Sequence, residues 1–288
     1  MNFEKFFYLG KNVTPLRPIF YQPHPALSGF ISHIMVMEAT FRPELDHLVF
    51  PFPPTPQHSI HFYPRDPMQT QRVNSIFEQT PDCIVIGPQV TKVNLKMGSN
   101  HCIVSVVFHP GGLHRLLKMP MHELFDQAYE ATWLLGSGLS EVNYKLREAK
   151  QPLEMKTIVD EYFLTKIVAS PVAAFDMALK QMVKSDGLLP IELAASLACL
   201  SLRQFERKFK DTMGYSPKVF SRLIRFSKAY RLKERQPHLS WTVIAHTCGY
   251  FDQMHLIRDF KEFTDAVPGT IALEINSVPM GLQAGMKF

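Results

Sequence analysis

Charged residues recur along one side of an expected helix in the last third of the chain. They are Arg203, Glu206, Arg207 and Lys210. Phe205 and Phe209, four residues apart, fall on another side. In a DNA major groove, arginine pairs with guanine O6 and N7 and glutamate accepts from cytosine N4. The pattern predicts a helix with a buried aromatic side and an outer side that contacts DNA bases.

A second expected helix has the same arrangement further along the chain. Leu256 and Phe260 are expected to point inward, and the outward positions are Met254, Ile257, Arg258 and Lys261. Met254 and Ile257 suit contact with a thymine methyl group. Lys210, Lys261 and the helix start at Ser201 suit phosphates, which position a protein without reading sequence.

An internal repeat at an offset of 51 residues relates the two segments. It pairs Leu193 with Ile244, Ala194 with Ala245, Ser201 with Asp252, Phe205 with Leu256, Arg207 with Arg258, Phe209 with Phe260, Lys210 with Lys261 and Pro217 with Pro268. Each copy is expected to form a short helix, a turn and a second helix. Ser201, followed by Gln204 at the capping-box spacing, and Asp252 are the expected N-caps of the second helices.

The turns and the ends of these helices differ between the copies. Gly249 suits the positive φ of a tight turn, and the first copy has Ala198 at that position of the repeat. Gly214 suits the left-handed residue after the first recognition helix, where the second copy has Asp265. The repeat therefore predicts the same fold in both copies, with different turn chemistry.

A helix expected between the copies sets their separation. Its apolar stripe consists of Val219, Leu223, Phe226 and Tyr230. Its basic residues are expected to project away from that stripe, and they are Lys218, Arg222, Arg225 and Lys228. A rigid helix here would place two reading helices in successive major grooves, about one helical turn apart.

Charge is concentrated in the same region. The 288-residue chain has a net charge of +5, and residues 201–235 hold eleven Lys and Arg against three Asp and Glu. The rest of the chain is therefore net negative, and the basic segment suits a polyanionic partner. With 46% hydrophobic and 20% charged residues, the composition argues against general disorder or a coiled-coil rod.

Localisation signals point to the cytoplasm. The start of the chain lacks the pattern of a secretory leader, and no apolar run is long enough for a membrane span. The four cysteines, Cys83, Cys102, Cys199 and Cys248, lie far apart and are expected to be buried reduced thiols. We therefore expect a cytoplasmic protein without a membrane partner.

The front half has a different texture. Short runs rich in branched and aromatic residues, at 31–37, 59–63, 83–87, 90–96 and 102–108, predict an antiparallel sandwich or barrel. Helical patterns follow, at 113–117, 121–129, 139–149 and 153–167. The expected class is α+β: a β-rich domain ending in helices over 1–168, an all-α domain over 169–275, and a flexible tail over 276–288.

Catalytic and metal-binding signals are weak. Among twelve histidines, His58 and His61 are near neighbours on an expected strand, but a spacing of three places them on opposite faces. The segment from His122 to Asp126 falls one residue short of a zinc-protease motif, and the Pro-Gly-Gly at 110–112 is expected to be a structural turn. We expect no enzyme activity, cofactor or metal. The alternative is a cupin-type metal enzyme with a helical targeting domain.

The segment from about Pro171 to Glu274 resembles the DNA-binding domain of the AraC/XylS family of transcriptional regulators, through residues 200–226 and 244–271. The resemblance implies two helix-turn-helix units joined by a linker helix. Its base-reading positions fall on Arg203, Glu206, Arg207, Gln253, Met254, Ile257 and Arg258. Leu256 departs from the family, in which an aromatic residue is commoner.

The front half resembles the N-terminal domains of uncharacterised regulators in that family, through residues 23–35, 85–89 and 108–112. The resemblance implies a cupin-like barrel that binds an effector, pairs two copies, or does both. The implied partners are double-stranded DNA, RNA polymerase, a small-molecule effector and a second copy of the chain. The sequence leaves open the operator, the effector and whether transcription rises or falls.

Overall fold

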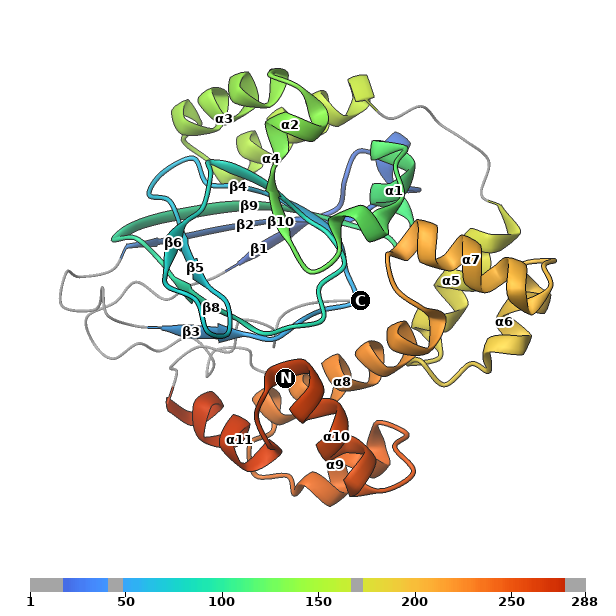
Figure 1. Ribbon diagram of the computed structural model, residues 1–288. Coiled ribbons are helices and arrows are strands. Elements are labelled where there is room, and N and C mark those ends of the chain that lie inside the picture. Colours follow the sequence, from blue (N-terminus) through green and yellow to red (C-terminus); the bar gives the residue numbers. More distant parts are fainter. Residues whose placement is uncertain (1–17, 41–48, 167–172, 278–288) are drawn as a thin grey trace.

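The computed structural model describes residues 18–40, 49–166 and 173–277. Its N-terminal half contains two antiparallel sheets (Figure 1). The six-stranded sheet has the order β1 (Ile19–Tyr21), β2 (Ile31–Thr40), β9 (Asn100–Phe108), β4 (Ser59–Phe62), β7 (Cys83–Ile86) and β10 (Ala128–Glu130). The four-stranded sheet has the order β3 (Phe50–Phe52), β8 (Val93–Lys96), β5 (Gln69–Gln71) and β6 (Glu78–Gln79).

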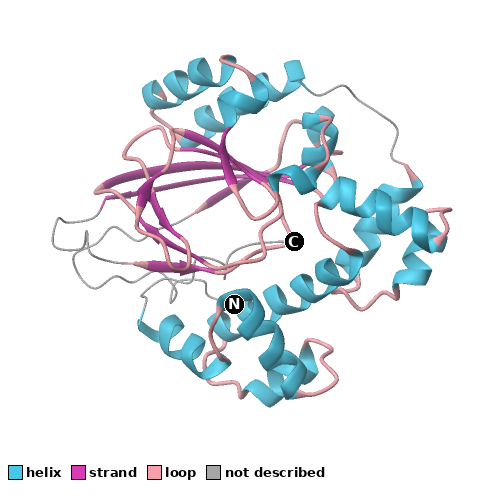
Figure 2. Ribbon diagram, in the orientation of Figure 1, coloured by secondary structure: helices cyan, strands magenta, loops and turns pink. Residues whose placement is uncertain are grey.

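The two faces of the six-stranded sheet serve different purposes because side chains alternate along each strand. Val104 and Val106 of β9 face helices on the outside, in a core that also contains Val159 and Phe163. Ile103 faces the other sheet, in a smaller core with Met37 and Tyr63. Figure 2 shows helices along the outer side of the six-stranded sheet, with the remaining helices beside and below the two sheets.

The helices of this half cover the outer face. They are η3 (Pro25–Leu27), α1 (Gly112–Leu117), η5 (Met121–Leu124), α2 (Ala131–Leu135), α3 (Gly138–Glu148) and α4 (Pro152–Lys166). The helix expected over 121–129 is wrong: η5 is a short 3-10 turn, and Ala128–Glu130 pairs with β7 as an edge strand. Asp126, with a φ of 53°, reverses the chain between these two elements.

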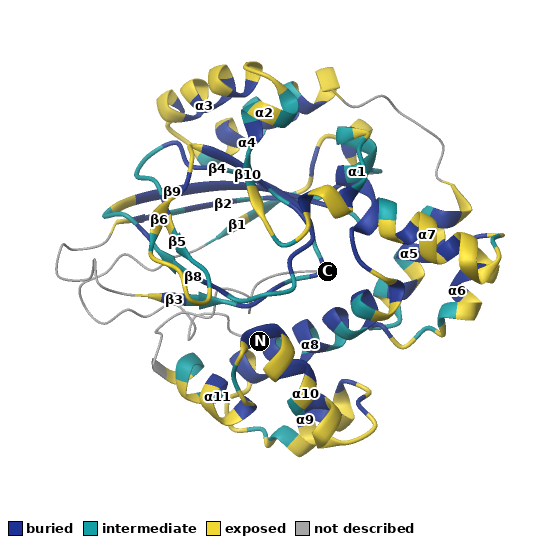
Figure 3. Cartoon of the chain, viewed as in Figure 1, coloured by how far each residue is buried: buried dark blue, intermediate teal, exposed yellow. Residues whose placement is uncertain are grey.

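The C-terminal half is entirely helical in the described residues and has one core. Its helices are α5 (Ala174–Lys184), α6 (Ile191–Leu197), α7 (Leu202–Met213), α8 (Pro217–Arg235), α9 (Trp241–Thr247), α10 (Gln253–Thr264) and α11 (Pro268–Ser277). Figure 3 shows their buried sides turned toward one another and their exposed sides outward. Helix α11 occupies the first two residues of the expected tail, and residues 278–288 lie outside the described part.

Four structural details bear on the sequence-based expectations. The expected domain boundary at 168/169 lies outside the described residues. Cys83, Cys102 and Cys248 are buried as expected, whereas Cys199 is exposed, so the expectation for that thiol is wrong. The Pro-Gly-Gly segment forms a turn, with Gly111 at a φ of 77°. None of the described helices has the length and apolar character needed to cross a membrane.

Candidate nucleic-acid interface

Two helix-turn-helix units form the C-terminal half: α6 with α7, and α9 with α10 (Figure 1). The second helices follow the offset of 51 that the sequence predicts, because the N-caps are Ser201 and Asp252. The first helices follow an offset of 50, from caps at Pro190 and Ser240. The expected pairing of Leu193 with Ile244 is therefore wrong.

Burial explains the shifted register of the first helices. Leu193 is equivalent to Val243, because the two side chains are 48% and 47% exposed. Ile244 is equivalent to Ala194, because both are fully buried. Ala245 is likewise equivalent to Ala195 and not to Ala194. The sequence repeat at an offset of 51 concealed the offset of 50 between the first helices. Small and branched apolar residues occur at neighbouring positions on both helices, so both offsets align similar residues.

The turns account for the extra residue in the second unit. Cys199, with a φ of 55°, and Gly249, with a φ of 73°, are the left-handed residues, so the counterpart of Gly249 in the first unit is Cys199 and not Ala198. One residue separates Cys199 from the cap Ser201, whereas Tyr250 and Phe251 separate Gly249 from the cap Asp252. Phe251 is 92% exposed, as suits an inserted residue.

Capping fixes the start of each second helix. The Ser201 hydroxyl accepts from the Gln204 backbone N–H at 3.4 Å, and Gln204 Oε1 accepts from the Ser201 backbone N–H at 3.0 Å. Asp252 Oδ1 accepts from the His255 backbone N–H at 2.8 Å. That bond, and a second from the His255 ring, lower the pKa of the Asp252 carboxyl.

The helix ends also agree with the sequence. Gly214 and Asp265 are both left-handed, with φ of 82° and 56°, and each backbone N–H donates back to a helix carbonyl. The expectation for these two residues is confirmed.

Aromatic packing holds the inner sides of both helices. Phe205 and Phe209 contact Phe175 of α5 at ring-centroid distances of 5.5 and 6.4 Å. Phe260 contacts Phe226 of α8 at 4.8 Å and Trp241 of α9 at 5.0 Å. Leu256 is fully buried, so an aliphatic side chain fills this position. Both second helices are therefore fixed to the same core.

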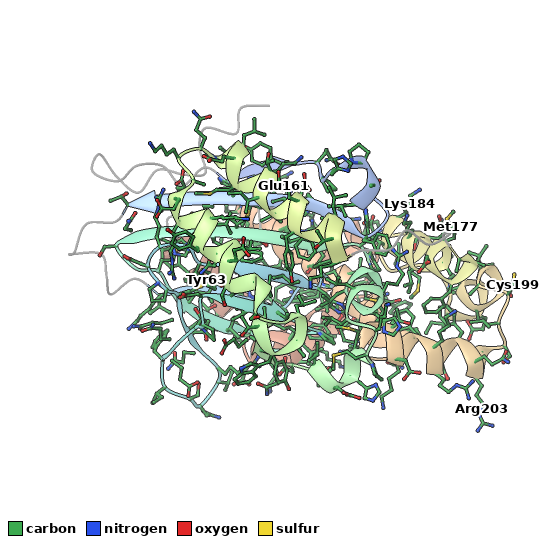
Figure 4. The ribbon with its side chains drawn as sticks, turned by 90° about the horizontal axis from the view of Figure 1, so that it is seen from above. Tyr63, Glu161, Met177, Lys184, Cys199 and Arg203 are labelled. Atoms are coloured by element: carbon green, nitrogen blue, oxygen red, sulfur yellow. The ribbon has the colours of Figure 1, made fainter. Side chains whose placement is uncertain are left out.

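The outer sides carry the residues expected to contact DNA. Ile257 is half-buried. The other residues expected to contact DNA are exposed, and they are Ser201, Arg203, Glu206, Arg207, Lys210, Gln253, Met254, Arg258 and Lys261. Arg203 points away from the body of the molecule (Figure 4). Gln253 is restrained because its Oε1 accepts from Thr242 Oγ1 at 2.9 Å. Within the described residues, Arg207 and Arg258 form no ion pair.

The linker helix α8 departs from the sequence-based expectation. Arg222, Arg225 and Lys228 are half-buried and engaged within the domain, so they do not project freely. Arg222 pairs with Asp259 of α10 at 2.7 Å and with Glu262. Arg225 donates to the Gly187 carbonyl at 2.8 Å, and Lys228 pairs with Asp186 at 2.8 Å. These contacts join α8 to both helix-turn-helix units.

No sequence pattern predicted the contacts between the two halves. Lys92 of the β-rich half pairs with Glu274 of α11 at 3.0 Å, and the Ser227 hydroxyl of α8 donates to the Pro54 carbonyl at 3.4 Å. A Cβ at Gly214 would overlap Pro88, so the end of α7 lies directly against the β-rich half. Glycine is therefore required at position 214 for two reasons: the left-handed backbone at the helix end and the lack of space for a Cβ beside Pro88. The sequence pattern predicted only the first.

The buried histidines do not form a metal centre. Across residues 18–40, 49–166 and 173–277, no three His, Cys, Asp or Glu side chains lie close enough together to hold an ion. His61 lines the space between the sheets, whereas His58 lies against the other half of the molecule, near the Met213 backbone. Their spacing separates them as the sequence predicts.

Two domain models match the chain, one in each half. Residues 194–272 match the model of a helix-turn-helix domain, and residues 19–130 match a domain of unknown function, DUF6597. No curated protein matches the chain.

Solved structures share low sequence identity with it. An apo variant of ToxT from Vibrio cholerae strain SCE256 is 12% identical, with 84% of this chain and 97% of that chain covered and a TM-score of 0.46. Wild-type ToxT with bound unsaturated fatty acid is 11% identical, with 89% and 98% covered and a TM-score of 0.45. A variant of hydroxyethylphosphonate dioxygenase is 14% identical, with 71% and 49% covered and a TM-score of 0.22.

The matched domain, the repeated caps and the exposed second helices agree with one another. Helix-turn-helix domains present their second helix to DNA. The chain combines an N-terminal domain of unknown function with a C-terminal helix-turn-helix domain, and it is a DNA-binding transcription regulator.

Proposed function

We propose that this regulator reads a specific DNA sequence by placing α7 and α10 in successive major grooves of one duplex. The observation that carries the proposal is the equivalent outward placement of Arg207 and Arg258 on two helices fixed to a common core. The linker α8 has 19 residues, and at 1.5 Å per residue its length is about 28 Å. That length is comparable with the roughly 34 Å between successive major grooves on one side of B-DNA.

The outward residues divide into two roles. Arg203, Glu206 and Arg207 of α7 read base edges in one groove. In the other groove, α10 uses Gln253, Met254, Ile257 and Arg258. Ser201, Lys210 and Lys261 contact phosphates and set the register of the protein on the duplex. The β-rich half holds an effector in the space between its sheets and performs no catalytic step.

Selection of bound fragments from genomic DNA, followed by affinity measurements, tests the reading residues. We expect Arg207→Ala and Arg258→Ala each to lose about 1–3 kcal/mol of discrimination at particular base pairs. Lys210→Ala is expected to weaken specific and random DNA alike and to reduce the slope of log affinity against log salt by about one. Each change removes one exposed side chain from a helix whose core is untouched.

Lys184→Ala is the matched control, because Lys184 is an exposed cation at the end of α5, outside both second helices (Figure 4). It should leave the affinity and the salt slope nearly unchanged. If the two arginine variants behave like this control on both specific and random DNA, the assignment of base-reading residues is wrong.

A further inference from the structure

The space between the two sheets is a cavity of about 150 Å³. Its walls are largely apolar and include Met35, Met37, Ile86, Leu95, Met97 and Ile103. Both sheets contribute, because alternate residues of their strands face inward. A cavity of about this volume in a protein core can hold one benzene ring. The size therefore favours a ligand with a single ring or a short branched chain.

A polar stripe runs along one wall of the cavity. Ser59 and His61 belong to β4, and Tyr63 directly follows this strand. As alternate residues of the chain, all three line the space. His61 Nε2 lies 3.0 Å from the Ser59 hydroxyl, and His61 Nδ1 lies 3.4 Å from the Tyr63 hydroxyl. These groups largely satisfy one another, so the stripe orients His61 within an apolar surface.

Two further polar side chains face the cavity without partners. Ser105 is 3% exposed and Gln89 is 9% exposed, and both line the space. Within the described part of the chain, neither side chain has a hydrogen-bond partner. Ser105 lies directly opposite His61 in the β4 and β9 register. Both groups face the cavity and are accessible from it, so a ligand that enters can supply their missing hydrogen bonds.

The cavity offers no uncommitted charge. Burial lowers the pKa of His61 to about 4, so the imidazole is neutral at pH 7. Arg72 also lines the space, but it pairs with Asp126 at 3.3 Å and donates to Thr91 Oγ1 at 3.4 Å. An anionic ligand would have to give up its hydration without gaining a free cation in exchange. The surroundings therefore favour an uncharged ligand.

The geometry points to a binding site for a small uncharged molecule that combines one apolar ring or short chain with a hydroxyl group, which bonds to Ser105. Only an effect of this ligand on DNA binding rests on the proposed effector role of the β-rich half. Binding to the cavity itself can be measured without DNA.

Calorimetric titration of the full chain at pH 7 with phenol, benzene and benzoate tests the site. Phenol is expected to bind at least tenfold more tightly than benzene, because it supplies the bond to Ser105, and at least tenfold more tightly than benzoate, because it is uncharged. No binding of phenol, or benzoate binding as tightly as phenol, would overturn the inference.

Ser105→Ala tests the hydroxyl contact. This variant keeps the apolar walls, so benzene should still bind while the preference for phenol falls toward equality. Ser221→Ala is the matched control, because Ser221 is a buried serine of α8 outside the cavity. The control should keep the full preference for phenol, and a Ser105→Ala variant that also keeps it would show that the hydroxyl contact is wrong.

A separate measurement distinguishes the ligand site from its regulatory role. The affinity for a selected DNA fragment is measured with and without phenol. If phenol binds with the expected preference and the DNA affinity is unchanged, the ligand class stands and the effector role is wrong. If the chain binds no DNA at all, the proposed reading function fails while the calorimetric result still decides the ligand class.

Discussion

Charged side chains of α8 join elements together instead of projecting into solvent. Arg222 donates to Asp259 and Glu262, and its guanidinium lies over the Phe263 ring with 5.4 Å to the centroid. These hydrogen bonds raise the pKa of Arg222 above its usual value. Because Asp259 is buried, removal of Arg222 would leave an unpaired charge in the domain interior and would lower the stability of the fold. The basic surplus of this segment is therefore partly structural.

Buried histidines make stability depend on pH. Burial lowers the pKa values of His58, His61 and His101 to about 4, whereas the unfolded chain protonates histidine below about 6.5. Between these values the unfolded state binds more protons, so stability falls as the pH falls through this window. Each histidine contributes at most about 1.4 kcal/mol per pH unit.

His101→Leu tests this relation, because His101 is fully buried and neither ring nitrogen has a partner within the described residues. The variant should be more stable than the wild type, and its advantage in the free energy of unfolding should be larger at pH 5 than at pH 7. Urea denaturation at the two pH values measures both. An equal advantage at each pH would show that His101 titrates normally.

At the scale of elements, the end of α7 lies directly against the β-rich half. Gly214 needs a left-handed backbone and also the space of a missing Cβ, since a Cβ there would overlap Pro88 and lie 2.9 Å from the Met121 carbonyl oxygen. The equivalent Asp265 in the second unit is exposed. The same helix ending thus contacts the β-rich half in one unit and solvent in the other.

Gly214→Asn should therefore loosen this contact while keeping a residue that tolerates left-handed geometry. We expect a loss of about 1–3 kcal/mol in the free energy of unfolding, as for other overpacked sites. Asp265→Asn, at the equivalent exposed position, should be nearly neutral. Urea denaturation measures both variants.

A double-mutant cycle separates the overlap from the backbone cost. Pro88→Ala removes the ring atom nearest to the missing Cβ, so it should recover part of the loss in the Gly214→Asn background. Strictly additive effects would mean that the overlap with Pro88 does not contribute to the loss. Faster amide exchange at the end of α7 and in η5 should accompany a true loosening.

Local patterns predicted most elements of the fold, and the misses have physical causes. Capping residues and aromatic spacing predicted α7 and α10, because these signals lie within a few residues of the helices they define. The shifted register of α6 and α9 escaped because a one-residue insertion at Phe251 leaves both flanking patterns intact. The segment 121–129 escaped because pairing with β7 outweighs a helical pattern that is only local.

The candidate site divides in the same way. The outward residues of α7 and α10 follow from helical periodicity. The role of Arg222 did not, because Asp259 and Glu262 lie 37 and 40 residues away and meet it only when the helices pack. The cavity also required the structure, since Ser105, His61 and Gln89 come from three parts of the β-rich half.

At the scale of the whole molecule, contacts on both sides of α8 give the two reading helices one fixed separation. Arg222 holds α10, while Arg225 and Lys228 hold the turn between α5 and α6. If both helices read DNA as proposed, one chain therefore has one allowed distance between two half-sites, in contrast to two units joined by a flexible linker. A flexible linker would accept several half-site spacings at a modest entropic cost.

DNA fragments with altered spacing test this rigidity. Once a target is selected, base pairs are inserted between its two half-sites. About five base pairs move one half-site to the opposite face of the duplex, and about ten move it by one full turn on the same face. Both insertions should reduce the affinity to that of a single half-site, because neither restores the fixed distance. Hydroxyl-radical footprints should then show protection at one half-site only. Recovery of full affinity at the ten-base-pair insertion would mean that the units move independently, or that two copies of the chain share the target.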